Sequence, residues 1–185
     1  MAYEVAQTLR APLDVMIVRK LGVPGWPELA MGAIASGGVR VVNDAVVQSA
    51  SIPPALMEQT AAMEAQELQR REVAYRGHPG APQVKDQILI LVDDGIATGA
   101  TIRAAALALR PQRPARLIIA VPTAAADACT MLEPLVDELV ALSKPISFRA
   151  VGQWYRDFSQ ISDAEVKRLL ARANGRAEAR SLDPQ

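Results

Sequence analysis

Two adjacent carboxylates, Asp93 and Asp94, follow an apolar run at residues 87–92 and precede a loop rich in glycine and threonine. The apolar run predicts a buried strand, and ligands of open α/β sheets bind at the carboxyl ends of such strands. The loop can direct backbone N–H groups and two hydroxyls at a phosphate, and the positive end of a following helix strengthens this attraction. The loop residues are Gly95, Ile96, Ala97, Thr98, Gly99, Ala100 and Thr101.

A carboxylate pair beside a phosphate-binding loop suits a phosphorylated sugar. The carboxylates would accept hydrogen bonds from sugar hydroxyls, and Mg²⁺ would offset the phosphate charge. Taken alone, Asp93-Asp94-Gly95 is more typical of a strand that ends in a turn, because aspartate and glycine are turn residues. The phosphate-type loop that follows directly favours the binding interpretation.

The composition limits the class of protein that can carry such a site. The chain has 185 residues, 50% of them hydrophobic and 22% charged, which predicts one globular domain rather than a disordered chain. Twenty basic residues balance 20 acidic ones, so nothing favours general nucleic-acid binding. One histidine, His78, and one cysteine, Cys129, exclude an internal disulfide framework and disfavour a zinc site made of protein ligands alone. No apolar stretch reaches the ~18 residues of a membrane span and no signal peptide is recognisable, so we expect a soluble cytoplasmic domain.

Strands and helices alternate along the sequence, which predicts an α/β fold with a mainly parallel sheet flanked by helices. Residues 21–38 are rich in glycine and proline and predict a long mobile loop. Residues 1–174 are expected to form a single domain and residues 175–185 a tail. Strands are expected at 13–18, 39–42, 87–92, 116–121, 138–142 and 147–151, and helices at 2–9, 52–76, 99–109, 123–133 and 162–173.

Residues 92–101 resemble the phosphoribosyl-pyrophosphate (PRPP) motif of the type I phosphoribosyltransferases, in which an apolar strand, two acidic residues and a Thr-Gly-x-Thr type of loop follow one another. The resemblance implies that Asp93 and Asp94 face the ribose hydroxyls of PRPP and that residues 96–101 hold its 5′-phosphate. It implies a Mg²⁺-dependent homodimer that transfers the phosphoribosyl group to a small nitrogen acceptor and releases pyrophosphate, as in nucleotide salvage. In the family, PRPP carries the Mg²⁺ near the two carboxylates, without a direct protein ligand.

A basic pair and the loop after it resemble two further parts of the family. Arg19 and Lys20 end the expected strand at 13–18, like the family strand whose basic end meets the pyrophosphate. The resemblance therefore makes both of them catalytic residues, while the alternative interpretation is a solvated strand end. The loop at 21–38 corresponds to the mobile catalytic loop of the family, which closes over PRPP and keeps water from an oxocarbenium-like transition state.

Residues 151–158 resemble the hood of the purine-type members, where an aromatic ring stacks on the base. The resemblance implies a base-binding role for Trp154, Tyr155 and Asp157 within a small hood at about 143–161, and it favours a purine acceptor. The alternative is a satellite core, because aromatic side chains are mainly core and interface residues. Residues 18–22 and 28–34 are also similar to a bacterial group of phosphoribosyltransferase-like proteins in which the acceptor is not assigned.

One feature of the family has no counterpart in this sequence. Family members begin with a strand and a glycine-rich pyrophosphate loop, whereas residues 2–6 resemble the helix that follows that loop. In the family this strand lies between the counterparts of 14–18 and 88–92, so we expect an incomplete pyrophosphate site unless another chain supplies the strand. The alternative function is therefore a catalytically inactive module that binds PRPP or a nucleotide. A generic nucleotide-binding domain such as a methyltransferase is disfavoured, because no glycine-rich loop follows the strand that ends near Val18.

Overall fold

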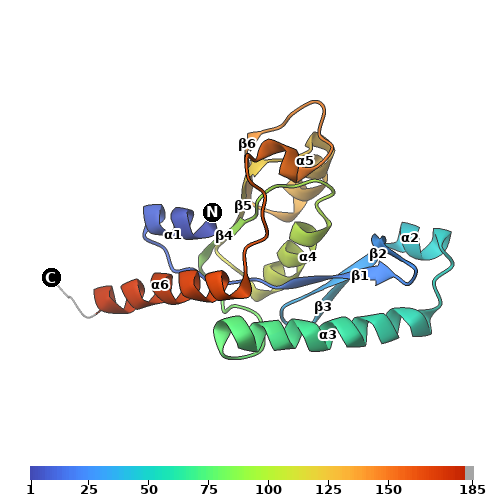
Figure 1. Ribbon diagram of the computed structural model, residues 1–185, viewed down its shortest axis with the longest axis horizontal. Helices are drawn as coiled ribbons and strands as arrows, with labels where there is room; N and C mark the ends of the chain where they lie inside the picture. The colour runs from blue at the N-terminus through green and yellow to red at the C-terminus, as the bar shows by residue number, and fades with distance from the viewer. Residues whose placement is uncertain (182–185) are drawn as a thin grey trace.

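The computed structural model describes the backbone of residues 1–181 and, within it, the side chains of residues 1–26 and 29–175. This part of the chain forms two three-stranded sheets with helices packed on them (Figure 1). The helices are α1 (Ala2–Leu9), α2 (Asp44–Ser49), α3 (Pro54–Arg76), α4 (Ala100–Leu109), α5 (Ala126–Leu132) and α6 (Asp163–Ser181), and the short 3-10 helices are η1 (Arg110–Gln112), η2 (Glu133–Leu135) and η3 (Val151–Trp154). The strands are β1 (Val18–Val23), β2 (Trp26–Ala35), β3 (Val39–Val42), β4 (Ile88–Val92), β5 (Arg116–Thr123) and β6 (Glu138–Ser143).

Strands β4, β5 and β6 form a parallel sheet in this order, which we call sheet B. Ile88 pairs with Arg116 at one end of the β4–β5 ladder, and Val92 pairs with Ala120 at the other. Helix α4 connects β4 to β5, and α5 connects β5 to β6, because parallel neighbours need crossover connections. The α/β class with a parallel sheet flanked by helices, predicted from the sequence, is confirmed.

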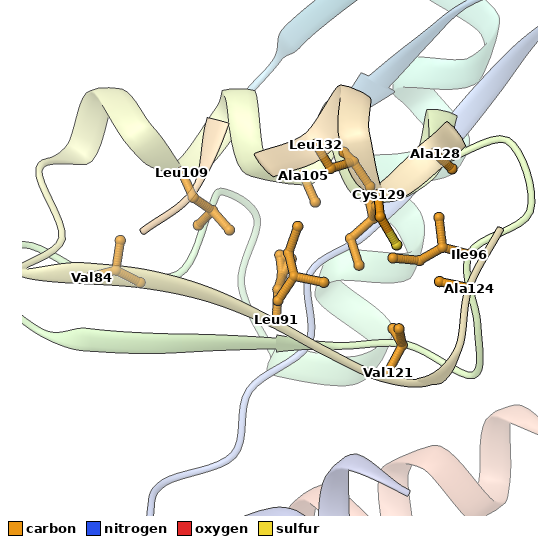
Figure 2. Packing of buried hydrophobic residues seen from close by; sticks show 12 residues of the cluster. Val84, Leu91, Ile96, Ala105, Leu109, Val121, Ala124, Ala128, Cys129 and Leu132 are labelled. Carbon is orange, nitrogen blue, oxygen red and sulfur yellow. The ribbon is translucent and has the colours of Figure 1, made fainter. Parts of the chain in front are cut away.

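Sheet B and its two crossover helices enclose the larger core cluster, part of which Figure 2 shows. Strand β5 alternates buried and less buried residues along its whole length, as a strand with one covered face should. The cluster includes Ile119 and Val121 of β5, Leu109 of α4, and Cys129 and Leu132 of α5. This core fixes the end of β4 relative to the start of α4, which are the two elements that position the acidic residues and the loop after them.

Strands β1, β2 and β3 form an antiparallel sheet, sheet A, where the sequence predicts a long open loop at 21–38. Only Pro24 and Gly25 separate β1 from β2, with Val23 paired to Trp26. Proline followed by glycine is typical of a type II turn, and Gly25 has the positive φ of 86° that such a turn needs. The prediction of an open loop is therefore wrong, because these residues mark one tight turn of a hairpin.

Helix α3 and helix α4 both pack on sheet A, and Figure 1 shows them on opposite sides of it. Leu21 and Met31 of the hairpin have no exposed surface and pack in a second cluster that includes Ala61 and Leu68 of α3. Because α4 also covers sheet B, it lies between the two sheets and joins them into one structure.

Residues 11–17 connect α1 to β1 without forming a paired strand, although the sequence predicts a strand at 13–18. The prediction of a buried strand is therefore wrong in its pairing, because no strand of the described residues pairs with this segment, and only Ile17 of residues 13–18 is buried. A cavity of about 530 Å³ lies between the segment, α1 and β4. Successive residues alternate between the two cores: Val15 and Ile17 pack in the sheet A cluster, and Met16 and Val18 against the sheet B cluster.

Helix α6 continues to residue 181, past the predicted end at residue 173, and residues 182–185 of the predicted tail lie outside the described residues. The hydroxyl of Tyr75 in α3 donates to Asp163 Oδ1 at 2.6 Å, at the start of α6. Farther along, the Arg172 guanidinium lies 5.4 Å from the centre of the Tyr3 ring in α1. Contacts with two other helices therefore stabilise α6. These contacts join residues far apart in the sequence, so a local sequence pattern cannot predict the length of the helix.

Candidate functional site

Asp93 and Asp94 lie directly after β4, at the carboxyl-terminal edge of sheet B, as the sequence predicts. The backbone N–H of Asp94 donates to Asp93 Oδ1 at 2.9 Å. Burial, together with a smaller contribution from the nearby Asp94 carboxylate, raises the pKa of Asp93 to about 6, against the lowering effect of this hydrogen bond. Asp94 itself is exposed. The acidic turn, residues 93–95, thus places one sheltered and one exposed carboxylate side by side, and both can accept hydrogen bonds from hydroxyl groups.

The loop after the acidic turn is held at Ile96 and is open beyond it. Ile96 is buried, and its N–H donates to the carbonyl of Thr123 at 3.0 Å. The carbonyl of Ile96 accepts from the Ala125 N–H at 2.8 Å. These two bonds fix the loop to the end of β5, so that the rest of the loop stays at the same edge of sheet B. The exposed loop residues are Ala97, Thr98, Ala100 and Thr101.

Helix α4 begins at Ala100, within the predicted loop, with Gly99 as its N-cap residue, so Ala100 and Thr101 belong to its first turn. Gly99 has a φ of 74°, and a Cβ atom there would lie 3.3 Å from Leu132 Cδ1, so glycine suits both the backbone and the packing. The first N–H groups of the helix have no partner within the helix and carry its positive end. Thr98 Oγ1 accepts from the Ala100 N–H at a long 3.5 Å. The exposed loop and the helix start can therefore accommodate a phosphate group.

The hood segment, which we define as residues 151–158, lies against the acidic turn. It begins with η3, so the strand predicted at 147–151 is wrong. A Cβ atom on Gly95 would lie 2.7 Å from Val151 Cγ1, so this close approach requires a glycine. The Tyr155 hydroxyl donates to the backbone carbonyl of Asp94. The structure thus brings one of the three predicted base-binding residues to the predicted sugar-binding residues.

The other two predicted base-binding residues make contacts within their own region. The Trp154 ring stacks on Phe148 with 6.3 Å between ring centres and is 45% exposed. The Asp157 carboxylate accepts from the hydroxyl of Ser159 and from its N–H, at 2.9 Å for the latter, and these bonds lower the pKa of Asp157. Asp157 therefore stabilises a local turn, while Trp154 presents an aromatic surface to solvent.

The predicted catalytic pair, Arg19 and Lys20, lies in β1 of sheet A. Arg19 Nε is 2.7 Å from Glu64 Oε2 of α3, and both side chains are partly buried. Lys20 is exposed. Val18, which directly precedes the pair, lines the same cavity as Asp93. The guanidinium of Arg19 is therefore engaged with α3.

Sequence reasoning did not find the contacts that hold the acidic turn in place. Val151 and Tyr155 reach it from more than 50 positions along the chain, and no local pattern indicates such a contact. Gly95 is the signal in the sequence, since a glycine after two carboxylates is compatible with a close approach as well as with a turn.

The described residues contain no cluster of three or more His, Cys, Asp or Glu side chains that could hold a metal ion. The helices of the described region also include none that is both long and apolar enough to cross a membrane.

Comparison with known proteins identifies the family. The model of the phosphoribosyl transferase domain matches residues 1–134, and the chain belongs to this family. Two Mycobacterium tuberculosis proteins, from strains CDC 1551 and H37Rv, are each named "Putative phosphoribosyl transferase" and are 45% identical to the chain over 183 residues. The alignment covers 98% of this chain and 41% of each relative, so the chain spans about two fifths of their length.

A solved structure shows the same fold. The crystal structure of TT1426 from Thermus thermophilus matches with a TM-score of 0.74 and 38% sequence identity, over 92% of this chain and 80% of that chain. Together with the family match, this structural match gives the fold of the type I phosphoribosyltransferases, with a small C-terminal hood.

Proposed function

We propose that this protein transfers the 5-phosphoribosyl group of PRPP to a nitrogen acceptor and releases pyrophosphate. One observation carries the proposal: a sheltered and an exposed carboxylate stand directly before an open loop that leads into the N-terminus of α4. This arrangement offers hydrogen-bond acceptors for sugar hydroxyls beside donors for a phosphate. The two sets of groups are complementary to those of a phosphorylated ribose. Membership of the phosphoribosyl transferase domain family supports it.

In the proposed reaction, Asp93 and Asp94 accept hydrogen bonds from the ribose hydroxyls and orient the ring. Thr98, Gly99 and Thr101 bind the 5′-phosphate through backbone N–H groups and hydroxyls. The anomeric C–O bond breaks and pyrophosphate leaves with its electron pair, while a C–N bond forms on the opposite face and the acceptor nitrogen loses a proton to solvent. Mg²⁺ bound to PRPP would supply charge neutralisation on the pyrophosphate. The contribution of the protein is orientation and charge stabilisation, without a covalent intermediate.

The acceptor and the leaving group are supported by fewer contacts. A purine base is the acceptor class that the hood implies, with the exposed ring of Trp154 as a stacking surface. Arg19 and Lys20 are proposed to bind the leaving pyrophosphate, which requires Arg19 to exchange its contact with Glu64. That same contact favours the second candidate, a module that binds PRPP or a nucleotide without turnover.

Pyrophosphate release from PRPP, measured with Mg²⁺ and each of the common purine and pyrimidine bases, tests the proposal. We expect release that needs both Mg²⁺ and one class of base, and a loss of about 100-fold or more in the Asp93→Asn, Asp94→Asn double variant. Asp44→Asn, which removes a carboxylate from α2, is the matched control and should keep wild-type release. PRPP binding without release for any base would support the binding module, and neither binding nor release would refute both.

A further inference from the structure

The hood segment contacts the acidic turn at two separate points. Val151 lies so close to Gly95 that a Cβ atom there would be 2.7 Å from Val151 Cγ1. Four residues later, the hydroxyl of Tyr155 donates to the carbonyl of Asp94. The two contacts fall on adjacent residues of the turn, so the hood supports the backbone that carries both carboxylates.

The orientation of Tyr155 is set by packing around its ring. The ring lies against Phe158, with 5.2 Å between ring centres and 39° between ring planes. Phe158 is in turn packed on Gly152, where a Cβ atom would lie 2.9 Å from Phe158 Cδ1. The partly buried ring is therefore held within the hood, and its hydroxyl is directed at the acidic turn.

The acidic turn is also held from the side of sheet B. Ile96, two residues after Asp94, donates its N–H to the carbonyl of Thr123 at the end of β5 and accepts at its carbonyl from the N–H of Ala125. Between these supports, the Asp94 N–H donates to Asp93 Oδ1. A hydrogen bond at the Asp94 carbonyl limits rotation of the Asp94–Gly95 peptide. This peptide adjoins the Asp93–Asp94 peptide, whose N–H holds the Asp93 carboxylate.

We propose that Tyr155 is a positioning residue, which orders Asp93 and Asp94 through the Asp94 carbonyl. This differs from the base-stacking role that the sequence implies, since one face of the Tyr155 ring is used by Phe158 and its hydroxyl by the backbone. The inference rests on the proposed function only in naming PRPP as the ligand that the two carboxylates receive. The competing interpretation is that Tyr155 packs the hood and that its hydroxyl bond has no consequence for the site.

The test uses Tyr155→Phe, which removes the hydroxyl and keeps the ring on Phe158. The matched control is Tyr75→Phe, which removes a hydroxyl that also bonds two distant parts of the chain, 2.6 Å from Asp163 Oδ1 and outside the site. Thermal unfolding of both variants establishes that each is folded. A ring that stacks on a base would survive in Tyr155→Phe, so any effect on the site belongs to the hydroxyl.

The first measurement needs no ligand. Amide hydrogen exchange, followed by NMR on the full chain, should become about two- to tenfold faster at Asp94, Gly95 and Ile96 in Tyr155→Phe, as the loss of one neutral hydrogen bond implies. These rates should stay at wild-type values in Tyr75→Phe. Wild-type exchange across the turn in Tyr155→Phe would overturn the proposal.

The second measurement is the Kd of Mg–PRPP, which should rise about two- to tenfold in Tyr155→Phe and not in Tyr75→Phe. A merely structural tyrosine would leave this Kd unchanged even where the turn exchanges faster, and that result would also overturn the proposal. If the wild-type chain does not bind Mg–PRPP, the proposed function fails, and the exchange rates alone decide whether Tyr155 orders the turn.

Discussion

Of the two carboxylates in the acidic turn, Asp93 has the environment that differs more from that of an ordinary surface carboxylate. Burial, with a further contribution from Asp94, raises its pKa to about 6 from an ordinary value of 3.8. A carboxyl group that resists ionisation in the folded protein is held in place at a cost to stability, and functional sites are where such costs are commonly found. A bound hydroxyl that donates to Asp93 would compensate for part of the lost hydration.

Replacing Asp93 with Asn should therefore stabilise the free protein at neutral pH. The folded protein binds the Asp93 proton more tightly than the unfolded chain, so the favourable contribution is complete below about pH 4 and is lost as the pH rises through about 6. Asn carries no charge and avoids that loss, so we expect a Tm at least about 2 °C above wild type at pH 8. The difference should shrink towards zero at pH 4, as measured by thermal unfolding followed by circular dichroism. Asp44→Asn controls for the loss of one carboxylate, and an equal Tm difference at both pH values would contradict this account of Asp93.

At the scale of elements, the end of α3 connects the loop after it to the segment before β1. Glu72 is 2% exposed, and its Oε2 accepts from the Gly80 N–H at 2.8 Å. Arg76, one turn later, donates to the Gly80 carbonyl, and its Nε lies 3.3 Å from Asp14 Oδ1. The two side chains thus fix the loop at 77–82 and the chain at Asp14, which borders the cavity beside β4.

Removing the Glu72 side chain should destabilise the protein through this connection. Glu72→Ala leaves the Gly80 N–H without its acceptor and opens space in a buried region, which costs about 1–3 kcal/mol. That corresponds to a fall in Tm of roughly 2–12 °C for a chain of this size. Glu58→Ala on the same helix is the control, since Glu58 is exposed and its ion pair with Arg40 should contribute about 1 kcal/mol or less. Equal Tm values for the two variants would show that the buried carboxylate does not hold the loop.

At the scale of the whole molecule, the features that can be predicted from the sequence are those that neighbouring residues determine. The apolar run of β4, the two aspartates and the Gly99 cap of α4 are contiguous, so their arrangement is predictable from spacing alone. Whether the segment at 11–17 pairs with a strand, and how long α6 is, depend on other parts of the chain. The predicted strand at 13–18 and the predicted helix end at residue 173 are therefore both wrong. The hairpin is a different case, since Pro24-Gly25 signals a tight turn, whereas the glycine and proline content of the whole segment indicates a loop. The hydrogen bond from Tyr155 to Asp94 joins residues far apart in sequence, so only the folded chain reveals it.

The acidic turn and the open loop lie at the edge of sheet B, whereas the basic pair lies in sheet A, where Arg19 contacts Glu64 of α3. Helix α4 packs on sheet A and contributes to the core of sheet B, so it connects the two sheets and carries the open loop at its start. The hood contacts the acidic turn at Asp94 and Gly95, while the end of β5 holds the next residue, Ile96. Binding of a phosphorylated sugar is therefore the property on which every functional proposal for this protein depends.

The most direct measurement is a calorimetric titration of the chain with PRPP, with and without Mg²⁺, repeated on the Asp93→Asn, Asp94→Asn double variant. We predict binding that requires Mg²⁺ and that weakens at least about tenfold in the double variant, because hydrogen bonds to charged groups contribute about 1.5–3 kcal/mol each. Asp44→Asn should bind as the wild type does. Absence of binding by a folded wild-type chain, or equal affinity in the double variant, would contradict the assignment of the acidic turn as a PRPP site.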